Sequence, residues 1–307
     1  MDAPAPFTNP HVTAGGEPRA SVDFRGLETL WLNTGTLCNL ACAHCYIESS
    51  PTNDRLAYLT RADVTGALAQ AKASGQPLRA IGITGGEPFM NPDIDAIMAD
   101  CLTAGLELLI LTNAMTPMRH HRDALLDLNA RYPGALTLRV SLDHFERAKH
   151  EEERGPRSFD PAIDGLSWLS ANGFRIAVAG RTMWGDDEAE MRAGYRALFA
   201  RAGIAIDADD PEALVLFPEM DESGATPEIT TACWQILDKD PASLMCASER
   251  MLVRRRGAKR ATYTACTLLP YDPEFNYGPE IEGASEPVTL NHPHCSRFCV
   301  LGGGSCG

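Results

Sequence analysis

Short apolar, β-branched runs alternate with segments of helical periodicity between Glu28 and Pro218. The runs predict strands at 29–33, 80–84, 107–112, 136–142, 175–179 and 213–217. The segments between them place apolar residues on one helical face, which predicts helices at 62–73, 94–104, 123–131, 162–171 and 188–202. Strands that alternate with helices favour a parallel sheet with right-handed crossovers. The sequence therefore predicts an α/β fold, with functional residues on the loops at the carboxyl ends of the strands.

A cysteine run follows the first predicted strand directly. Its members, Cys38, Cys42 and Cys45, have the spacing C-x3-C-x2-C, and His44 precedes the third cysteine. A [4Fe-4S] cluster normally takes four protein ligands, so three thiolates leave one iron open. An open iron is available to a substrate or cofactor, and the spacing therefore indicates catalysis rather than electron storage.

The net charge and the N-terminal sequence argue against several classes of function. The chain has 27 basic and 41 acidic side chains, a net charge of −14, which argues against binding to nucleic acid or to an anionic membrane. The basic run 254–256 is too short to reverse this balance, and we expect it to solvate a hairpin. No basic start precedes an apolar stretch at the N-terminus, so we predict no signal peptide, no membrane span and a cytoplasmic location. The ten cysteines are then expected to hold metal or perform redox chemistry.

The chain changes character after Pro218. A polar linker at 220–227 leads to a short helix ending near Leu237, and the remainder is rich in loops and cysteine. A hairpin is predicted with arms at 251–255 and 261–264. The tail has too few apolar residues to fold without a cross-link or another stabilising group. We expect a flexible N-terminal segment at 1–27, a barrel at 28–218 and a C-terminal region at 219–307.

The cysteine run and a second motif together resemble the radical S-adenosylmethionine (SAM) superfamily. The second motif is Gly85-Gly86-Glu87-Pro88, at the end of the second predicted strand. The resemblance implies a partial (β/α)6 TIM-like barrel in which the amine and carboxylate of SAM bind the open iron. It further implies an electron from a flavodoxin or ferredoxin, cleavage of SAM to methionine and a 5′-deoxyadenosyl radical, and hydrogen abstraction from a peptide or small-molecule substrate.

The same resemblance assigns SAM-binding roles to strand-end residues. Gly85 and Gly86 let the backbone approach the methionyl group, and Glu87 accepts a hydrogen bond from its ammonium. Weaker matches have structural alternatives: a turn for the Thr112-Asn113 pair, a helix cap for Ser141, and a surface salt bridge for Arg181, which is matched to the SAM carboxylate. His44 is expected to stack on adenine or on the cysteine loop.

Asp143 and the segment 150–157, which follow the fourth predicted strand, each have two interpretations. Asp143 either caps the loop that follows it or contacts the substrate. The segment 150–157 resembles a loop of peptide-modifying members, and its alternative is a solvated charged face.

The remaining cysteines fall into two groups. Cys101 and Cys233 share helical faces with apolar residues and are expected in the core. The other group resembles SPASM and Twitch auxiliary-cluster regions and consists of Cys246, Cys266, Cys295, Cys299 and Cys306. Five cysteines suffice for one auxiliary [4Fe-4S] cluster, although the gap between the first two departs from familiar spacings. The alternative is a zinc knot, which His292 and His294 would assist. The alternative function is accordingly a non-catalytic iron-sulfur or zinc protein for electron transfer or scaffolding.

Overall fold

The computed structural model describes residues 5–218 and 226–304, which fold around a nine-stranded sheet. Six of its strands run parallel in chain order and match the predicted strands to within two residues: β2 (Thr29–Asn33), β3 (Ala80–Thr84), β4 (Glu107–Thr112), β5 (Leu136–Ser141), β6 (Arg175–Arg181) and β7 (Leu214–Phe217). The predicted α/β class and the parallel order are therefore confirmed. The sheet is open, with β7 at one edge.

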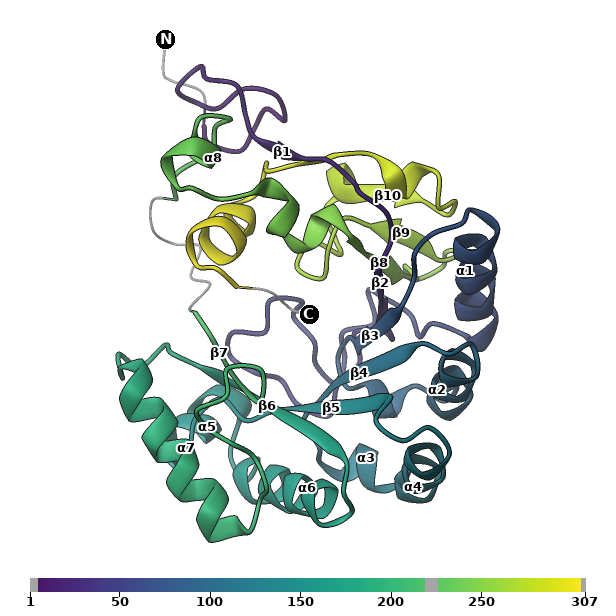
Figure 1. The fold of residues 1–307 in the computed structure, drawn as a ribbon, viewed down its shortest axis with the longest axis vertical. Coiled ribbons are helices and arrows are strands. Elements are labelled where there is room, and N and C mark those ends of the chain that lie inside the picture. Colours follow the sequence, from purple (N-terminus) through teal and green to yellow (C-terminus); the bar gives the residue numbers. More distant parts are fainter. Residues whose placement is uncertain (1–4, 219–225, 305–307) are drawn as a thin grey trace.

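The helices that connect these strands lie on the outer side of the curved sheet (Figure 1). The five predicted helices are present: α1 (Arg61–Ala73), α2 (Ile94–Thr103), α4 (Arg122–Arg131), α6 (Phe159–Ala171) and α7 (Glu188–Ala202). Local signals fix their ends, since Thr60 and Asp63 form a capping box at α1 and Gly203 ends α7 in the left-handed conformation.

Two more helices were not predicted. They are the short α3 (Thr116–Arg119) and the highly charged α5 (Arg147–Arg154). The sequence of α5, RAKHEEER, lacks the apolar spacing on which the prediction of helices rested.

Alternate side chains of each strand enter two separate apolar layers. On β2, Leu30 and Leu32 pack with the helices in one core, whereas Trp31 packs with the C-terminal region in a second core. Leu109 and Leu111 of β4 also pack against the second core. The inner face of the open barrel is therefore covered by the C-terminal region.

The C-terminal region also extends the main sheet. The predicted hairpin is present as β8 (Glu249–Val253) and β9 (Thr262–Thr264), and β10 (Asn276–Gly278) follows as the outermost strand. β8 pairs with β2 in parallel, with Thr29 opposite Glu249. Sequence reasoning placed this hairpin in a separate region because a parallel partner cannot be read from a β-hairpin pattern.

The basic run beside the hairpin does more than solvate it. The Arg254 Nη1 lies 2.9 Å from Asp63 Oδ2 on α1, and the Arg256 Nη1 lies 2.9 Å from Asp54 Oδ1. These ion pairs join the hairpin to the barrel.

The segment before Glu28, which the sequence predicts to be flexible, has defined contacts from residue 5 onward. Its strand β1 (Ser21–Val22) pairs antiparallel with β11 (Val288–Thr289). The guanidinium of Arg19 is fully buried and pairs with Glu228. A paired strand and a buried ion pair tie this segment down, and neither is visible as a local pattern.

The other short elements of the C-terminal region are α8 (Cys233–Ile236) and a π-helix at Cys295–Leu301. No helix in the described ranges is long and apolar enough to cross a bilayer.

Candidate cofactor site in the barrel

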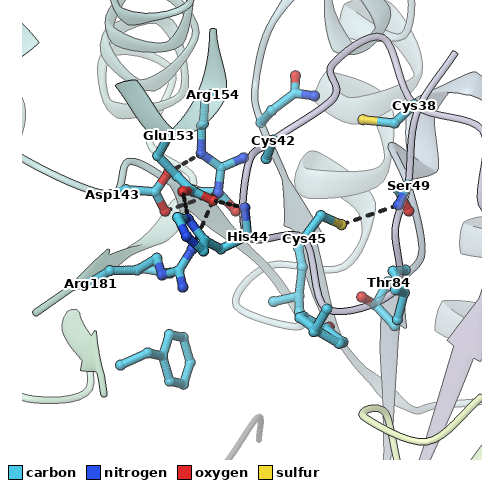
Figure 2. A pocket seen from close by; sticks show the side chains of 18 of the residues that line it. Cys38, Cys42, His44, Cys45, Ser49, Thr84, Asp143, Glu153, Arg154 and Arg181 are labelled. Atoms are coloured by element: carbon cyan, nitrogen blue, oxygen red, sulfur yellow. Dashed lines mark hydrogen bonds and ion pairs between the residues drawn. The ribbon is translucent and has the colours of Figure 1, made fainter. Parts of the chain in front are cut away.

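A cavity of about 190 Å³ opens where the parallel strands end at the cysteine loop. Figure 2 shows a close view of it, with the cysteine loop facing charged side chains of α5, of β6 and of the segment after β5. All the predicted barrel residues except Glu87 line this cavity: Cys38, Cys42, His44, Cys45, Gly85, Gly86, Thr112, Asn113, Ser141 and Arg181. Residues from five separate segments of the sequence are thus brought to one place.

The three loop cysteines have the chemistry of cluster ligands. Burial raises the pKa of Cys38 to about 12 and raises the pKa of Cys42, and each is raised further by the neighbouring thiols. Without metal the thiol of Cys38 is therefore protonated at neutral pH. Two sulfur atoms already accept backbone hydrogen bonds, from Leu40 N at 3.4 Å to Cys38 Sγ and from Ser49 N at 3.3 Å to Cys45 Sγ.

These features fit an iron-sulfur cluster, which supplies soft irons for the thiolates. Across the described ranges, no three His, Cys, Asp or Glu side chains are grouped so as to hold a metal ion. A [4Fe-4S] cluster differs from a single ion in taking each thiolate on a different iron.

The glycines of the Gly-Gly-Glu-Pro loop are required by the cysteine loop itself. Gly85 has φ = +133°, and a Cβ there would lie 2.6 Å from the carbonyl oxygen of Gly35. A Cβ on Gly86 would overlap the carbonyl oxygen of Leu37. Gly86 N instead donates to Gly35 O at 2.8 Å, so the two loops meet backbone to backbone. The sequence predicted close approach to a ligand and did not anticipate this contact between loops.

Glu87 connects the loop after β3 to the end of β4. Its carboxylate accepts hydrogen bonds from Thr112 Oγ1 at 2.8 Å and from the backbone N of Asn113 at 2.9 Å. The side chain is buried, and burial raises its pKa to about 7 although these hydrogen bonds oppose the shift. Because its oxygens hold β4 and it does not line the cavity, its predicted contact with the SAM ammonium stays a prediction.

A network of charged side chains, which sequence reasoning mostly missed, holds the other side of the cysteine loop. Glu153 on α5 accepts a hydrogen bond from His44 N at 3.1 Å, and its Oε2 lies 2.7 Å from His44 Nδ1. Its Oε1 also accepts from Arg181 Nη1 at 2.8 Å, and its carbonyl oxygen accepts from Ala43 N at 2.8 Å. One glutamate thus joins the loop to β6, and Arg181 pairs with a buried carboxylate rather than lying in a surface salt bridge.

The neighbouring residue, Arg154, extends this network to the segment that follows β5. Arg154 donates to both carboxylate oxygens of Asp143. Burial alone would lower the pKa of Arg154, but the charge of Asp143 holds it above its usual range. The alternative reading of 150–157 as a solvated charged face is therefore wrong for two of its residues, since His150 is fully buried and Glu153 is 3% exposed. The available signal was the Gly155-Pro156 pair, which is typical of a helix end.

The remaining walls of the cavity combine one further cation with apolar groups. Arg139 points to the cavity from β5 and is 8% exposed. Leu268 and Phe298 come from the C-terminal region, and the Phe298 ring stacks on Phe217 at a centroid distance of 5.8 Å. The C-terminal region therefore forms part of the enclosure.

Three C-terminal cysteines gather in the second core. Cys246 precedes β8, Cys266 follows β9, and Cys295 begins the π-helix. Burial raises the pKa of Cys246 to about 11 and that of Cys266 to about 12, and it raises that of Cys295 well above the usual range. All three belong to one cluster of buried residues in this core. Cys299 is half-buried one turn further along the same helix.

Three cysteines remain, Cys101, Cys233 and Cys306. Cys306 lies outside the described residues. Cys101 is fully buried in the core formed by α2, which confirms its expected packing role. Cys233 is half-buried and packs against the second core.

Comparison with known proteins identifies the family. The model of the radical SAM superfamily matches residues 32–193, which is more than half of the chain. The chain belongs to the radical SAM superfamily.

Among curated relatives, the chain is 32% identical over 148 residues to the antilisterial bacteriocin subtilosin biosynthesis protein AlbA of Bacillus subtilis, covering 46% of this chain and 30% of AlbA. It is 28% identical over 144 residues to the AdoMet-dependent heme synthase of Methanosarcina barkeri, covering 46% of this chain and 38% of the synthase. The chain thus spans less than half the length of these relatives.

The radical SAM fold is also found by structural comparison. The structure of Streptococcus suis SuiB bound to S-adenosylmethionine matches with a TM-score of 0.58 at 15% identity, covering 82% of this chain and 63% of SuiB. The open parallel sheet with its outer helices thus agrees with the partial barrel that the sequence motifs predicted.

Proposed function

We propose that this protein is a radical SAM enzyme that uses the cavity at the cysteine loop to bind SAM beside a [4Fe-4S] cluster. The observation that carries the proposal is that Cys38, Cys42 and Cys45 share one cavity with the Gly-Gly-Glu-Pro loop. When bound, the cluster supplies one electron that cleaves SAM to methionine and a 5′-deoxyadenosyl radical, which abstracts hydrogen from the substrate. The role of the protein is orientation, electrostatics and exclusion of water.

Different residues hold the cluster and orient SAM. Cys38, Cys42 and Cys45 hold the cluster, and Gly85 and Gly86 leave room beside it. The hydroxyl of Ser141 and the guanidinium of Arg181 lie at adjacent strand ends, where they orient the polar groups of SAM.

Other residues position this set indirectly. Glu87 holds Thr112 and Asn113 at the end of β4, and Glu153 holds His44. Leu268 and Phe298 shield the reacting atoms from water.

We further propose one auxiliary [4Fe-4S] cluster in the C-terminal region. Its ligands are drawn from Cys246, Cys266, Cys295, Cys299 and Cys306. Support comes from the gathering of the first three in the second core and from the placement of Cys299 one turn after Cys295. The π-helix itself is a rare element that is frequent at functional sites.

The substrate is proposed to be a peptide. AlbA is named for the biosynthesis of a bacteriocin and is the relative at 32% identity, which favours this class. A small molecule is the alternative, because the heme synthase matches over a similar share of the chain. A flavodoxin or ferredoxin is the proposed reductant.

The test is anaerobic reconstitution with iron and sulfide, followed by dithionite and SAM. We expect methionine and 5′-deoxyadenosine in equal amounts, measured by mass spectrometry. A variant with Cys42→Ala and Cys45→Ala should release neither product, and Cys101→Ala, which changes a buried core cysteine, should behave like the wild type. A fully reconstituted cluster that never cleaves SAM would instead indicate the non-catalytic iron-sulfur function.

A further inference from the structure

Arg250 is a fully buried cation on β8 with no carboxylate partner anywhere in residues 5–218 and 226–304. Its hydrogen bonds all go to backbone carbonyl oxygens: Nε donates to Ala284 at 2.7 Å, Nη1 to Cys246 at 2.6 Å and to Glu249 at 2.7 Å, and Nη2 to Glu286 at 3.0 Å. These contacts satisfy the donors of the guanidinium and leave its charge uncompensated.

Two aromatic rings enclose the same guanidinium. Its central carbon lies 4.3 Å from the ring centroid of Phe24 and 5.5 Å from that of Tyr277. The carboxylate next to it in the chain, that of Glu249, is engaged elsewhere, since its Oε2 accepts from Trp31 Nε1 at 2.6 Å. Among the described residues, no carboxylate therefore forms an ion pair with Arg250.

The backbone contacts of Arg250 place it beside the C-terminal cysteines. Its Nη1 donates to the carbonyl oxygen of Cys246, and Cys246, Cys266 and Cys295 belong to one cluster of buried residues. An arginine does not lose its proton in a protein, so its charge persists whether or not these thiols are ionised.

A buried unpaired cation is strongly destabilising, whereas the same cation beside an anion is compensated. Cluster ligation converts the thiols to thiolates and places net negative charge beside the guanidinium. We propose that Arg250 is the counter-charge of the auxiliary cluster held by Cys246, Cys266 and Cys295, and that it raises the reduction potential of that cluster. This inference rests on the proposed auxiliary cluster and adds to it a positioning residue that is not a ligand.

The test measures the reduction potentials of both clusters in the reconstituted protein by EPR-monitored titration. Reduction adds negative charge, which the guanidinium stabilises, so Arg250→Met should lower the potential of one cluster and leave the other unchanged. We expect at least a tenfold change in the ratio of reduced to oxidised cluster, about 59 mV for one electron. Arg250→Lys keeps the charge and should stay close to the wild type.

Arg254→Gln is the matched control. It removes an arginine just beyond the same strand, but one that is already paired with Asp63. Both potentials should stay at their wild-type values in this variant. Unchanged potentials in Arg250→Met at full iron content would overturn the inference, as would a tenfold change in the Lys variant.

A second measurement covers the case in which Arg250→Met folds poorly. Iron loading should raise the melting temperature of the wild type and of Arg250→Lys alike, because both carry the compensated cation. A much smaller rise in the Lys variant would contradict a role based on charge. A failure of the proposed auxiliary cluster gives a different result. If the C-terminal region binds no cluster, the variant with Cys246→Ala and Cys266→Ala should keep all its iron although Arg250 is present.

Discussion

The two cysteine sets of this protein lie in opposite environments. The barrel set borders an open cavity and is held by a network of paired charges on α5, on β6 and in the segment after β5. Cys246, Cys266 and Cys295 of the C-terminal set are enclosed in an apolar core, and the buried cation Arg250 contacts the backbone of Cys246. The first environment leaves room for a ligand, whereas the second is an apolar core with a buried cation beside it. The difference supports our proposal that the barrel set holds the reacting cluster, and we infer that the C-terminal set has a role in electron transfer or structure.

The largest expected effect separates the two sets by mutation. Cys42→Ala with Cys45→Ala should lose about half of the bound iron and all SAM cleavage. Cys246→Ala with Cys266→Ala should lose the other half and retain SAM cleavage without substrate, since that region does not ligate the open iron. Iron analysis and 5′-deoxyadenosine release check both. Loss of cleavage in the second variant, at wild-type melting temperature, would contradict the division of roles.

The charged network of the barrel set is expected to show the next largest effect. Glu153→Gln weakens the pairing with Arg181 and His44 and should reduce SAM cleavage 10–100-fold, by about the amount typical of residues that orient metal ligands. The matched control is Glu152→Gln on the same helix, which changes only an exposed glutamate bonded to Trp184. Steady-state rates with iron content per chain are the measurement, and equal rates for the two variants would refute the positioning role.

A glycine substitution tests the contact between the loops of the barrel set. In Gly86→Ala the new Cβ would overlap the backbone of Leu37. We expect the free energy of unfolding to fall by about 1–3 kcal/mol, and less cluster to be bound. Gly66→Ala in α1 meets nothing within 4 Å and should be stabilising by about 1 kcal/mol. Denaturant unfolding measures both, and a neutral Gly86→Ala would mean that the loops separate without cost.

Acid should lower the free energy of unfolding through His150, which is buried on α5, the helix that holds the cysteine loop. Burial lowers its pKa from 6.5 to about 4, so the folded state binds fewer protons than the unfolded state between these values. Its stabilising contribution is present above pH 6.5 and is lost as the pH falls toward 4. Between pH 6.5 and pH 5 the loss is about 2 kcal/mol.

The corresponding experiment compares His150→Leu with the wild type by urea unfolding at the two pH values. The difference in unfolding free energy between the two proteins should change by about 2 kcal/mol in favour of the variant at pH 5. The exposed residue His120 supplies the control, since His120→Leu should leave the pH dependence of the wild type intact. A pH-independent difference for His150→Leu would mean that its ring is not held neutral.

Sequence reasoning succeeded where one local pattern carried the information. The β-branched runs gave the strands β2–β7, and the spacing of Cys38, Cys42 and Cys45 marked a loop that lines the cavity. It failed where partners lie far apart. The charges on α5 have the pattern of a solvated helix, and only the fold shows that Glu153 and Arg154 point inward to His44 and Asp143.

The same limit applies to the C-terminal region. The hairpin β8–β9 was visible from its turn, but its pairing with β2 joins residues more than two hundred positions apart. Likewise, nothing beside Arg250 in the sequence indicates that its side chain is surrounded by carbonyl oxygens rather than carboxylates.

The parallel pairing of β2 with β8 has a consequence for how the chain reaches its native state. During synthesis β2 emerges before the other strands of the main sheet, yet β8, which covers its outer edge, is made only after β3–β7. Until then β2 presents unpaired backbone groups that any other extended chain can join. The cysteine loop begins directly after this strand, so a nascent chain has to protect its aggregation-prone edge and its thiols at the same time.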